Sequence, residues 1–308
     1  MAGDPAGIGP EVAAKLLAEP ETLECAEIVL IGDRAVFQAG DELPILPVAL
    51  AAKPPMGCVS QEAGAFALAT LRRAAEAIRK GEVNAIVYAP LNKQAMKLAG
   101  LLQEDEMHYL ACQLAFTGLC SEINVAANLW TTRVTSHVPL SRVADLIDED
   151  SVYRAIGLLD RIMRGCRETA PRIAVAGLNP HAGEGGLLGS EEIRFIAPAV
   201  VRAKAEGIDV SGPYPADTLF IAARRGDFDA VVTMYHDQGQ IAMKLMGFEK
   251  GVTLHGGLPV PVATPAHGTA FDIVGRGIAN AGPIREAFRL AVRLSSSLPY
   301  KGNHNRAA

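Results

Sequence analysis

Apolar and polar residues alternate along this chain in two recurring patterns. Short apolar runs, each typical of a buried strand, occupy residues 27–32, 84–89, 123–130, 172–177 and 229–235. Between them apolar residues recur at every third or fourth position, as they do on one face of a helix. Strands that alternate with helices predict an α/β fold, in which helices cover the faces of a largely parallel sheet.

The longest helix is expected over residues 61–80, where Leu68, Leu71, Ala75 and Ile78 fall on one face. Further helices are predicted over 152–162, 190–206 and 284–295, with Ser190 as a plausible N-cap of the second.

The first residues form a distinct motif. Residues 3–11 read Gly-Asp-Pro-Ala-Gly-Ile-Gly-Pro-Glu, which is typical of a loop that leads into a helix. Almost nothing precedes the motif that could form the strand expected there, and a truncated N-terminus is one interpretation of this. The start has neither a basic head nor an apolar segment and does not resemble a secretory signal. No apolar run reaches the roughly 18 residues that a membrane-spanning helix needs.

Composition narrows the possible functions. The 308 residues are 49% hydrophobic and 20% charged, enough for a substantial core and for two packed units. A net charge of -5 and only 5% aromatic residues argue against nucleic acid or an anionic membrane as a partner. The five cysteines are odd in number and scattered, which favours a reduced, cytoplasmic location.

Three of the predicted post-strand loops each contain one histidine: His137, His181 and His236. Ligands of such folds bind beyond the carboxyl ends of the strands. A catalytic metal site needs three protein ligands and an open position, and imidazole suits Zn²⁺ or a similar divalent ion. Three unrelated loop histidines are the alternative, because the spacing alone is not a zinc signature.

The segment 267–280 (HGTAFDIVGRGIAN) is the most specific string in the chain. Its glycines permit close approach of a ligand to the backbone, and Asp272 could accept hydrogen bonds from ribose hydroxyls. A tight structural loop is an equally good interpretation of the composition. Neither a Rossmann fingerprint nor a Walker loop is present.

These motifs carry a family resemblance. Segment 267–280 resembles the cofactor loop of the β-decarboxylating dehydrogenases, and residues 3–11 resemble the 4-hydroxythreonine-4-phosphate dehydrogenase family within that superfamily. Residues 179–186 (NPHAGEGG), 215–220 (PADTLF) and 235–239 (YHDQG) match in the same order. The resemblance implies an isocitrate-dehydrogenase-like α/β/α fold with two interwoven domains and a central cleft.

The resemblance also implies a domain layout and a homodimer. We expect a first α/β domain of residues 1–101 plus 270–308, and a second of residues 102–269 that carries the metal ligands and the dimer interface. His137, His181 and His236 fall on the family's metal ligands, in a site shared across that interface, with His137 the ligand we expect from the other subunit.

Further site residues follow from the same resemblance. Lys244 and His108 fall on substrate-binding positions. His267, Gly268, Asp272 and Asn280 belong to the segment that would bind the adenosine end of NAD. The three residues Asp217, Asp237 and Lys93 are weaker candidates, the aspartates for orienting a metal-bound histidine and Lys93 for catalysis beside Lys244.

The expected reaction is oxidation of a 3-hydroxy acid to a β-keto acid, with hydride transfer to NAD⁺, a divalent metal at the hydroxyl and loss of CO₂. A metal-dependent hydrolase or lyase without NAD is the alternative from another class, and a non-catalytic binder a third.

The substrate end departs from the family pattern. Tyr109 follows His108, where the family has a small residue with a hydroxyl group. Thr253 and Val262 stand where the family has an asparagine and an arginine. We still expect Thr253 to contact the substrate. Loss of an arginine removes a bidentate anion contact. We therefore expect a non-phosphorylated acid, such as an aromatic cis-dihydrodiol carboxylate, with a phosphorylated four-carbon hydroxy acid as the alternative.

Overall fold

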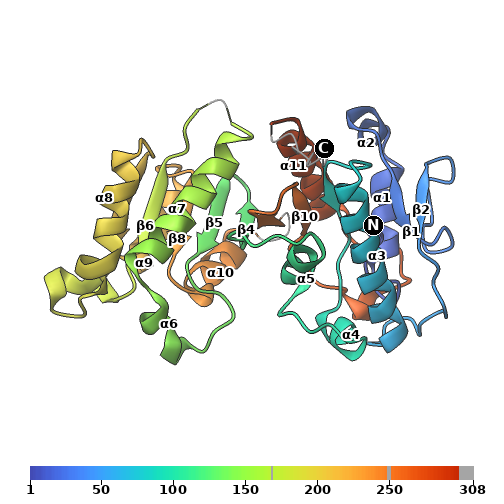
Figure 1. Ribbon diagram of the computed structural model, residues 1–308, viewed down its shortest axis with the longest axis horizontal. Helices are drawn as coiled ribbons and strands as arrows, with labels where there is room; N and C mark the ends of the chain where they lie inside the picture. Colours follow the sequence, from blue (N-terminus) through green and yellow to red (C-terminus); the bar gives the residue numbers. More distant parts are fainter. Residues whose placement is uncertain (168, 248–250, 298–308) are drawn as a thin grey trace, which may run out of the picture. The chain divides into compact units, whose positions relative to one another are not determined.

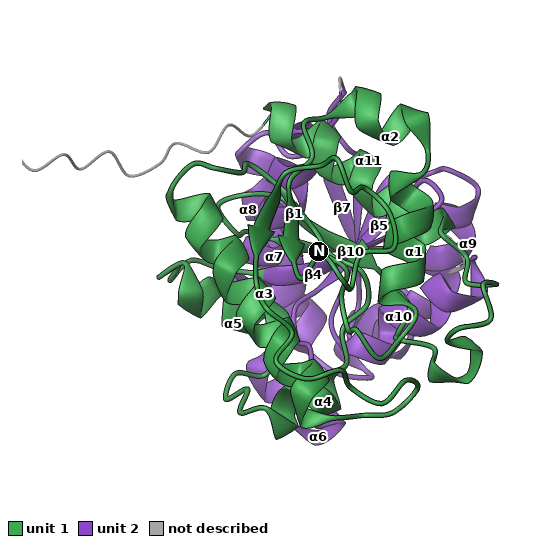
Figure 2. Ribbon diagram, turned by 90° about the vertical axis from the view of Figure 1, so that its right-hand side faces the viewer, with its two compact units in different colours: residues 1–120, 249–308 green, residues 121–248 purple. Residues whose placement is uncertain are grey.

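The computed structural model describes residues 1–167, 169–247 and 251–297 of the chain. It divides into two compact units, and Figures 1 and 2 show their elements. Unit 1 comprises residues 1–120 and 249–308, and unit 2 comprises residues 121–248. Unit 1 is thus built from two chain segments that flank unit 2 in the sequence. The compact units change after residues 120 and 248, whereas the predicted domains change after residues 101 and 269. The predicted domain layout stays a prediction.

Unit 1 contains two small sheets and the helices around them. Strands β1 and β2 pair in parallel, and β10 pairs in parallel with β3 and antiparallel with β9. Helix α3 packs on α4, α5 and β1, and α11 packs on β10, β9 and β3. The elements are α1 (Gly9–Leu17), α2 (Pro20–Cys25), β1 (Leu30–Gly32), β2 (Ile45–Pro47), α3 (Gln61–Arg79), β3 (Ile86–Val87), α4 (Lys93–Leu98), α5 (Glu106–Gln113), β9 (Val252–Gly256), β10 (Val262–Pro265), the 3₁₀ turn η4 (Phe271–Ile273) and α11 (Gly282–Ser297).

Unit 2 is organised around a five-stranded sheet in the order β4-β5-β8-β6-β7, antiparallel only between β4 and β5. Helix α7 packs on α8 and η2, α9 on β6 and β8, and α10 on β5 and β8. The elements are β4 (Ser121–Ala126), β5 (Leu129–Arg133), α6 (Leu140–Leu146), α7 (Glu149–Arg164), β6 (Ile173–Ala176), the 3₁₀ segment η1 (Pro180–Gly186), the π-helix η2 (Glu192–Ile196), α8 (Ala197–Ala205), β7 (Val210–Tyr214), α9 (Ala216–Arg224), β8 (Ala230–Thr233) and α10 (His236–Leu245).

The helix expected over 61–80 is confirmed as α3, which buries an apolar stripe that includes Phe66, Leu71 and Ile78. Ser60 caps it, because its hydroxyl accepts the Ala63 N–H. Burial of this stripe against β1, α4 and α5 fixes the core of unit 1.

Two expected elements differ from the structure. The single strand expected over 123–130 is wrong: β4 and β5 form a hairpin that turns at Ala127, a non-glycine residue with φ 52°. The helix expected over 190–206 is present without a break over residues 191–205, but its first part is the π-helical turn η2, which continues directly into α8. Ser190 precedes it, and its carbonyl accepts the Arg194 N–H at 2.9 Å. Pro198 lacks a backbone N–H, so regular α-helical hydrogen bonding cannot extend through this junction.

No helix within the described part of the chain combines the length and the apolar character needed to cross a membrane.

Candidate functional site

The segment after β5 places His137 beside His236. The backbone N–H and the hydroxyl of Thr135 both donate to the carbonyl of Met234, at 3.0 and 2.8 Å. This extends the parallel pairing of β5 and β8 beyond the ends of both strands. The rings of His137 and His236 consequently lie with their centroids 5.6 Å apart. Two of the three predicted metal ligands therefore come together within one chain.

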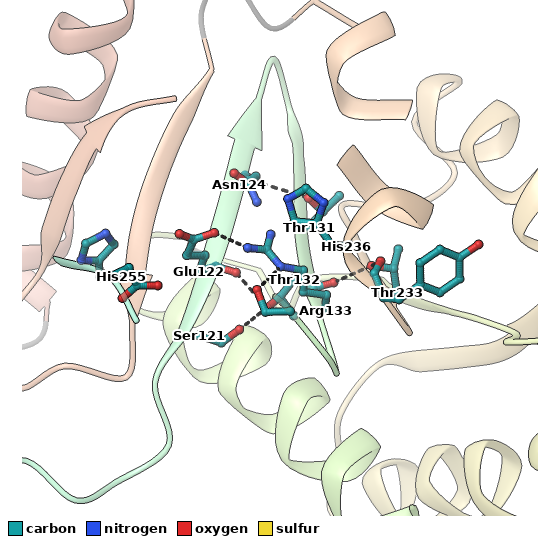
Figure 3. Close-up of polar contacts among 12 residues, drawn as sticks. Ser121, Glu122, Asn124, Thr131, Thr132, Arg133, Thr233, His236 and His255 are labelled. Atoms are coloured by element: carbon teal, nitrogen blue, oxygen red, sulfur yellow. Dashed lines mark hydrogen bonds and ion pairs between the residues drawn. The ribbon is translucent and has the colours of Figure 1, made fainter. Parts of the chain in front are cut away.

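Polar contacts connect the two strands of the β4–β5 hairpin with each other and with β8 (Figure 3). The side chain of Arg133 is buried, forms an ion pair with Glu122, and donates through Nε to the Ser136 hydroxyl at 2.9 Å. Thr132 accepts a hydrogen bond at its carbonyl from the Thr233 hydroxyl of β8, at 3.2 Å. Because Ser136 directly precedes His137, this side-chain hydrogen bond restrains the residue next to that histidine.

The imidazole of His236 has a carboxylate partner. Its Nδ1 lies 2.6 Å from Oδ1 of Asp237, so Nε2 is the nitrogen left for an ion. This contact is compatible with the predicted orienting role of Asp237, which stays a prediction. Asp217 is exposed in the first turn of α9 and makes no hydrogen bond or ion pair with the described residues, so its orienting role stays a prediction. Lys244 lies on α10, exposed, about 12 Å along the helix from His236.

The loop after β6 carries His181 in an unusual backbone conformation. Residues 181–185 all have positive φ, and three of them are not glycine: His181 (φ 53°), Ala182 (φ 52°) and Glu184 (φ 44°). Each non-glycine residue in this region costs about 1–2 kcal/mol. Nδ1 of His181 lies 3.2 Å from Oε2 of Glu184, which again leaves Nε2 for an ion. Because this conformation is unfavourable, the segment between β6 and η2, here called the 177–189 loop, must be held by contacts with residues outside it.

Glu192 supplies such contacts from beneath the loop. It is 2% exposed. Its Oε1 accepts the backbone N–H groups of Leu178 and Asn179, both at 2.7 Å, and its Oε2 accepts Nδ2 of Asn179 at 3.0 Å. In the sequence, Glu192 is simply an acidic residue near the start of a predicted helix. Its role depends on tertiary contacts that periodicity cannot reveal.

Gln238 connects the loops that carry His181 and His236. Its Nε2 donates to the carbonyl of Gly177 at 2.8 Å, and its Oε1 accepts the Met234 N–H at 2.7 Å. One amide therefore spans the ends of β6 and β8. Gln238 belongs to the motif at residues 235–239, but nothing in the sequence indicates this bridging contact.

The donor set fits a divalent ion. Two imidazoles are neighbours, and two of the three have Nδ1 against a carboxylate, as in metal sites whose histidines bind through Nε2. Within one chain, however, the described residues do not bring His181 together with His137 and His236 into a group able to hold an ion.

In unit 1, the 267–280 loop is open. A Cβ at Gly268, Gly275 or Gly277 would meet nothing within 4 Å, and the carboxyl of Asp272 is exposed, with no hydrogen bond to the described residues. An exposed backbone and a free acceptor suit the ribose and phosphates of a dinucleotide. The loop is therefore compatible with the predicted NAD contact.

Two other predicted residues of that loop have local partners. Asn280 accepts the Gly282 N–H at 2.8 Å and so shapes the start of α11. His267 points Nδ1 at the Gly268 carbonyl, 3.0 Å away.

A pair of charged residues on α1 holds the end of the same loop. Nζ of Lys15 donates to the carbonyls of Gly277 and Ala279 at 2.9 and 2.7 Å, and Glu11 accepts the Ala279 N–H at 2.8 Å. The two side chains also form an ion pair at 2.8 Å. Burial would raise the pKa of Glu11, but the hydrogen bonds from Lys15 and Ala279 hold it below its usual value. The motif at residues 3–11 therefore connects directly to the 267–280 loop.

His108 and Lys93 lie around one buried carboxylate. Asp105 caps α5 by accepting the His108 N–H at 2.9 Å, and its Oδ1 is 2.7 Å from Nδ1 of the same residue. Burial alone would raise the pKa of Asp105, but the hydrogen bonds from His108 and the charge of Lys93 lower it. Two predicted cationic candidates thus share a neighbourhood on the surface of unit 1.

A buried cluster in unit 1 was not foreseen. The Tyr88 hydroxyl lies 3.0 Å from Nε2 of His255 and donates to Oε1 of Glu106 at 3.4 Å. His255 is 2% exposed within β9. Because it occupies an apolar run, the pattern alone marks it as an ordinary strand residue.

The residues that suggested a flat, uncharged substrate belong to the interior of unit 1. Tyr109 packs against the hydrophobic core, and its hydroxyl donates to the Leu68 carbonyl at 3.4 Å. Val262 is fully buried in β10. Thr253 is partly buried in β9, and its predicted contact with substrate stays untested. Tyr109 and Val262 therefore do not describe the wall of a substrate pocket.

Unit 1 also has a cavity of about 570 Å³ between α1, α11 and the segments 25–30 and 81–87. Its lining includes Leu16, Leu30 and Phe288, and none of the predicted site residues.

Solved structures define the fold class. The chain is similar to isocitrate dehydrogenase from Methylococcus capsulatus (TM-score 0.54, 14% identity, 96% of this chain and 86% of that one). It is also similar to a β-decarboxylating dehydrogenase from Thermococcus kodakarensis (TM-score 0.55, 17% identity, 93% and 80% covered). The α/β fold is thus isocitrate-dehydrogenase-like, as expected.

The family model described as pyridoxal phosphate biosynthetic protein PdxA matches residues 10–291, and the chain belongs to this family. A Pseudomonas aeruginosa relative, provisionally named 4-hydroxythreonine-4-phosphate dehydrogenase 2, is 48% identical, with 95% of each chain covered. The 4-hydroxythreonine-4-phosphate dehydrogenase of Beijerinckia indica is 41% identical (97% and 95% covered). The D-threonate 4-phosphate dehydrogenase of Salmonella typhimurium is 38% identical (95% and 97% covered).

Two structures bear on the substrate. The 4-hydroxythreonine-4-phosphate dehydrogenase of Klebsiella pneumoniae has a TM-score of 0.81 and 36% identity, with 96% of each chain covered. The terephthalate 1,2-cis-dihydrodiol dehydrogenase of Burkholderia xenovorans has a TM-score of 0.67 and 28% identity, with 96% and 97% covered. The expectation of a non-phosphorylated acid is therefore not supported, and the phosphorylated alternative is the better one. The dehydrogenase names of these proteins support an oxidoreductase and not a hydrolase.

Proposed function

We propose that this chain is an NAD-dependent, divalent-metal-assisted dehydrogenase that oxidises a phosphorylated four-carbon 3-hydroxy acid of the 4-hydroxythreonine 4-phosphate or 4-phosphothreonate type. The observation that carries the proposal is the pairing of His137 with His236 at 5.6 Å in a chain of this family. The β-keto acid that forms would then lose CO₂.

The residues of the chain divide the work between binding and orientation. When bound, NAD⁺ accepts the hydride from the carbinol carbon, and a divalent ion such as Zn²⁺ lowers the pKa of the hydroxyl. His137, His181 and His236 would hold the ion, and Asp237 keeps His236 in the orientation that uses Nε2.

Other residues would bind the anionic groups of the hydroxy acid and the adenosine part of NAD. Lys244, His108 and Lys93 are the cationic candidates for the phosphate and carboxylate groups. Asp272 would accept the adenosine ribose hydroxyls, and its charge would disfavour the 2′-phosphate of NADP.

A direct test measures NADH formation from 4-hydroxythreonine 4-phosphate, 4-phosphothreonate and a terephthalate dihydrodiol, with Zn²⁺ or Mn²⁺ added. We expect turnover of a phosphorylated substrate, lost by at least about a thousandfold in His236→Ala because one ligand of the ion is gone. Asp145→Asn, an exposed carboxylate on α6, is the control and should behave like the unaltered protein. Turnover of the dihydrodiol alone, or full activity of metal-free His236→Ala, would contradict the proposal.

We infer in addition that the site is completed in a homodimer. The pairing of His137 with His236 in one chain favours His181, and not the expected His137, as the ligand from the other subunit. Support comes from the separation of His181 from the His137–His236 pair within the described residues of one chain. Mixing His181→Ala with His236→Ala subunits should then restore part of the activity, because hybrid dimers contain one intact ligand set. Absence of restoration in mixtures shown to exchange subunits would place His181 and His236 of one site in the same chain. A cytoplasmic location stays a prediction.

A further inference from the structure

We propose that Glu192 is a positioning residue, which holds the 177–189 loop in the conformation that presents His181 to a divalent cation. This inference rests on the proposed function, because it assigns a role toward the same metal site. Glu192 is 2% exposed and stands in the π-helical turn η2, directly after the loop. A carboxyl group this deeply buried is stable only when its oxygens are hydrogen-bonded.

The hydrogen bonds of Glu192 go to the first residues of the loop. Oε1 accepts two backbone N–H groups, those of Leu178 and Asn179, and Oε2 accepts the side-chain amide of Asn179. Bonds from N–H groups to a carboxylate are stronger than neutral ones. They anchor the chain two and three residues before His181.

Glu192 also contacts the part of the loop that follows His181. A Cβ built on Gly183 would lie 2.7 Å from Oε2 of Glu192, closer than real Cβ atoms approach. The carboxyl therefore packs against the bare backbone of Gly183, which has φ 80°. Anchored before His181 and supported after it, the left-handed turn has one arrangement. Histidine ligands need such support, because a metal tolerates only small errors in their position.

The surroundings of Asn179 make this role testable with small changes. Its Nδ2 donates both to Glu192 and to Oε2 of Glu191, at 3.0 and 2.7 Å. In Glu192→Gln the new amide nitrogen faces that donor. Rotating the Asn179 amide by half a turn would relieve this clash but would put its oxygen against the carboxyl of Glu191.

Two further variants follow from the same geometry. Glu191→Gln alone keeps an oxygen acceptor for Asn179 and is the matched control. In the double variant Glu191→Gln/Glu192→Gln, both new amides can donate to a rotated Asn179, so the network is satisfied again. A residue that merely stabilised the fold through its bulk would not show this pattern of loss and rescue.

The experiment titrates each full-length variant with Co²⁺, whose visible absorption distinguishes nitrogen from thiolate ligands and so separates the site from the exposed Cys25, Cys58 and Cys112. We expect Glu192→Gln to weaken Co²⁺ binding by about 10- to 100-fold, Glu191→Gln to leave it unchanged, and the double variant to recover most of the loss. Amide hydrogen exchange of residues 178–188 without metal should be faster in Glu192→Gln only.

The possible results separate two failures. Co²⁺ affinity and loop exchange of Glu192→Gln equal to those of the unaltered protein would overturn the positioning role and leave the proposed function intact. No histidine-type Co²⁺ spectrum in the unaltered protein, or one unchanged by His236→Ala, would overturn the metal site and with it the role of Glu192. Equal loss in Glu192→Gln and the double variant would also count against the proposal, because the hydrogen-bond pattern would not matter.

Discussion

The 177–189 loop of unit 2 and the 267–280 loop of unit 1 are fixed by different means. Glu192, 2% exposed, holds the first from inside. The ion pair of Glu11 and Lys15, with side chains 15% and 38% exposed, holds the end of the second from its rim. A buried carboxyl allows little movement, whereas a partly exposed pair allows more. This difference matches the proposed roles, because metal ligands need exact placement and a long dinucleotide gains affinity from many contacts.

The strongest challenge to this comparison is Gly183→Ala. The added Cβ meets Oε2 of Glu192 at 2.7 Å, and alanine is strained at φ 80°. We expect a loss of about 2–3 kcal/mol in the free energy of unfolding, measured by urea denaturation, together with weaker metal binding.

Gly185→Ala is its matched control, because that position has φ 64° but nothing within 4 Å of an added Cβ. It should cost only about 1 kcal/mol from backbone strain. Equal losses in both variants would show that the contact with Glu192 contributes nothing.

The pH dependence of unfolding tests the contact between Asp229 and Arg172, which precede strands β8 and β6. Burial would raise the pKa of Asp229, but hydrogen bonds from Arg172 and the charge of Arg167 lower it. A lowered pKa stabilises the fold above the unfolded value, near 4, and the benefit is lost as the pH falls through the folded value. Asp229→Asn should therefore cost about 1 kcal/mol at pH 7, discounted for the half-exposed Arg172, and less in acid. A cost that stays constant with pH would contradict this.

Lys15→Met tests whether the hydrogen bonds of Lys15 to the end of the 267–280 loop support NAD⁺ binding. Loss of two hydrogen bonds to loop carbonyls should raise the KM for NAD⁺ about fivefold, equivalent to about 1 kcal/mol, with a smaller change in kcat. Steady-state kinetics measures both, and Lys53→Met on the exposed surface is the control. A fall in kcat at constant KM would place Lys15 in another role.

In unit 1, the contribution of Asp4 to the free energy of unfolding should change with pH in the direction opposite to that of Asp229. Asp4 is 1% exposed, and burial raises its pKa even though Oδ1 accepts the Ala6 N–H at 2.8 Å. A raised pKa gives stability that is present below the unfolded value and lost as the pH rises through the folded value. Asp4→Asn should thus gain roughly 0.5 kcal/mol near pH 7 and nothing in acid, by denaturation at both pH values. A loss at pH 7 would mean that the charged carboxylate is stabilising.

Much of this architecture could be predicted from the sequence, and the exceptions have physical causes. The apolar stripe of α3 and the histidine-bearing motifs are local signals. The hairpin at Ala127 has no glycine or proline to mark it, so 123–130 looked like one strand. The π-helix after Ser190 depends on Pro198 and on the inward turn of Glu192.

Within the candidate site, the sequence indicated candidate ligand-binding residues, whose roles stay predictions, and did not indicate the residues that support their loops. Gln238 and Glu192 act through backbone groups far along the chain, and His255 lies buried in a strand. No periodicity marks such partners, because their roles are set by which strand ends are adjacent in the sheet.

The left-handed turn at residues 181–185 also bears on how the protein responds to heat. L-amino acids do not wind this way unaided, so the turn exists only while the surrounding structure enforces it. Heating that breaks the hydrogen bonds of Glu192 would therefore release this segment even while the β-sheet stays folded. Catalytic competence would then disappear at a lower temperature than the circular dichroism of the strands, and return on cooling.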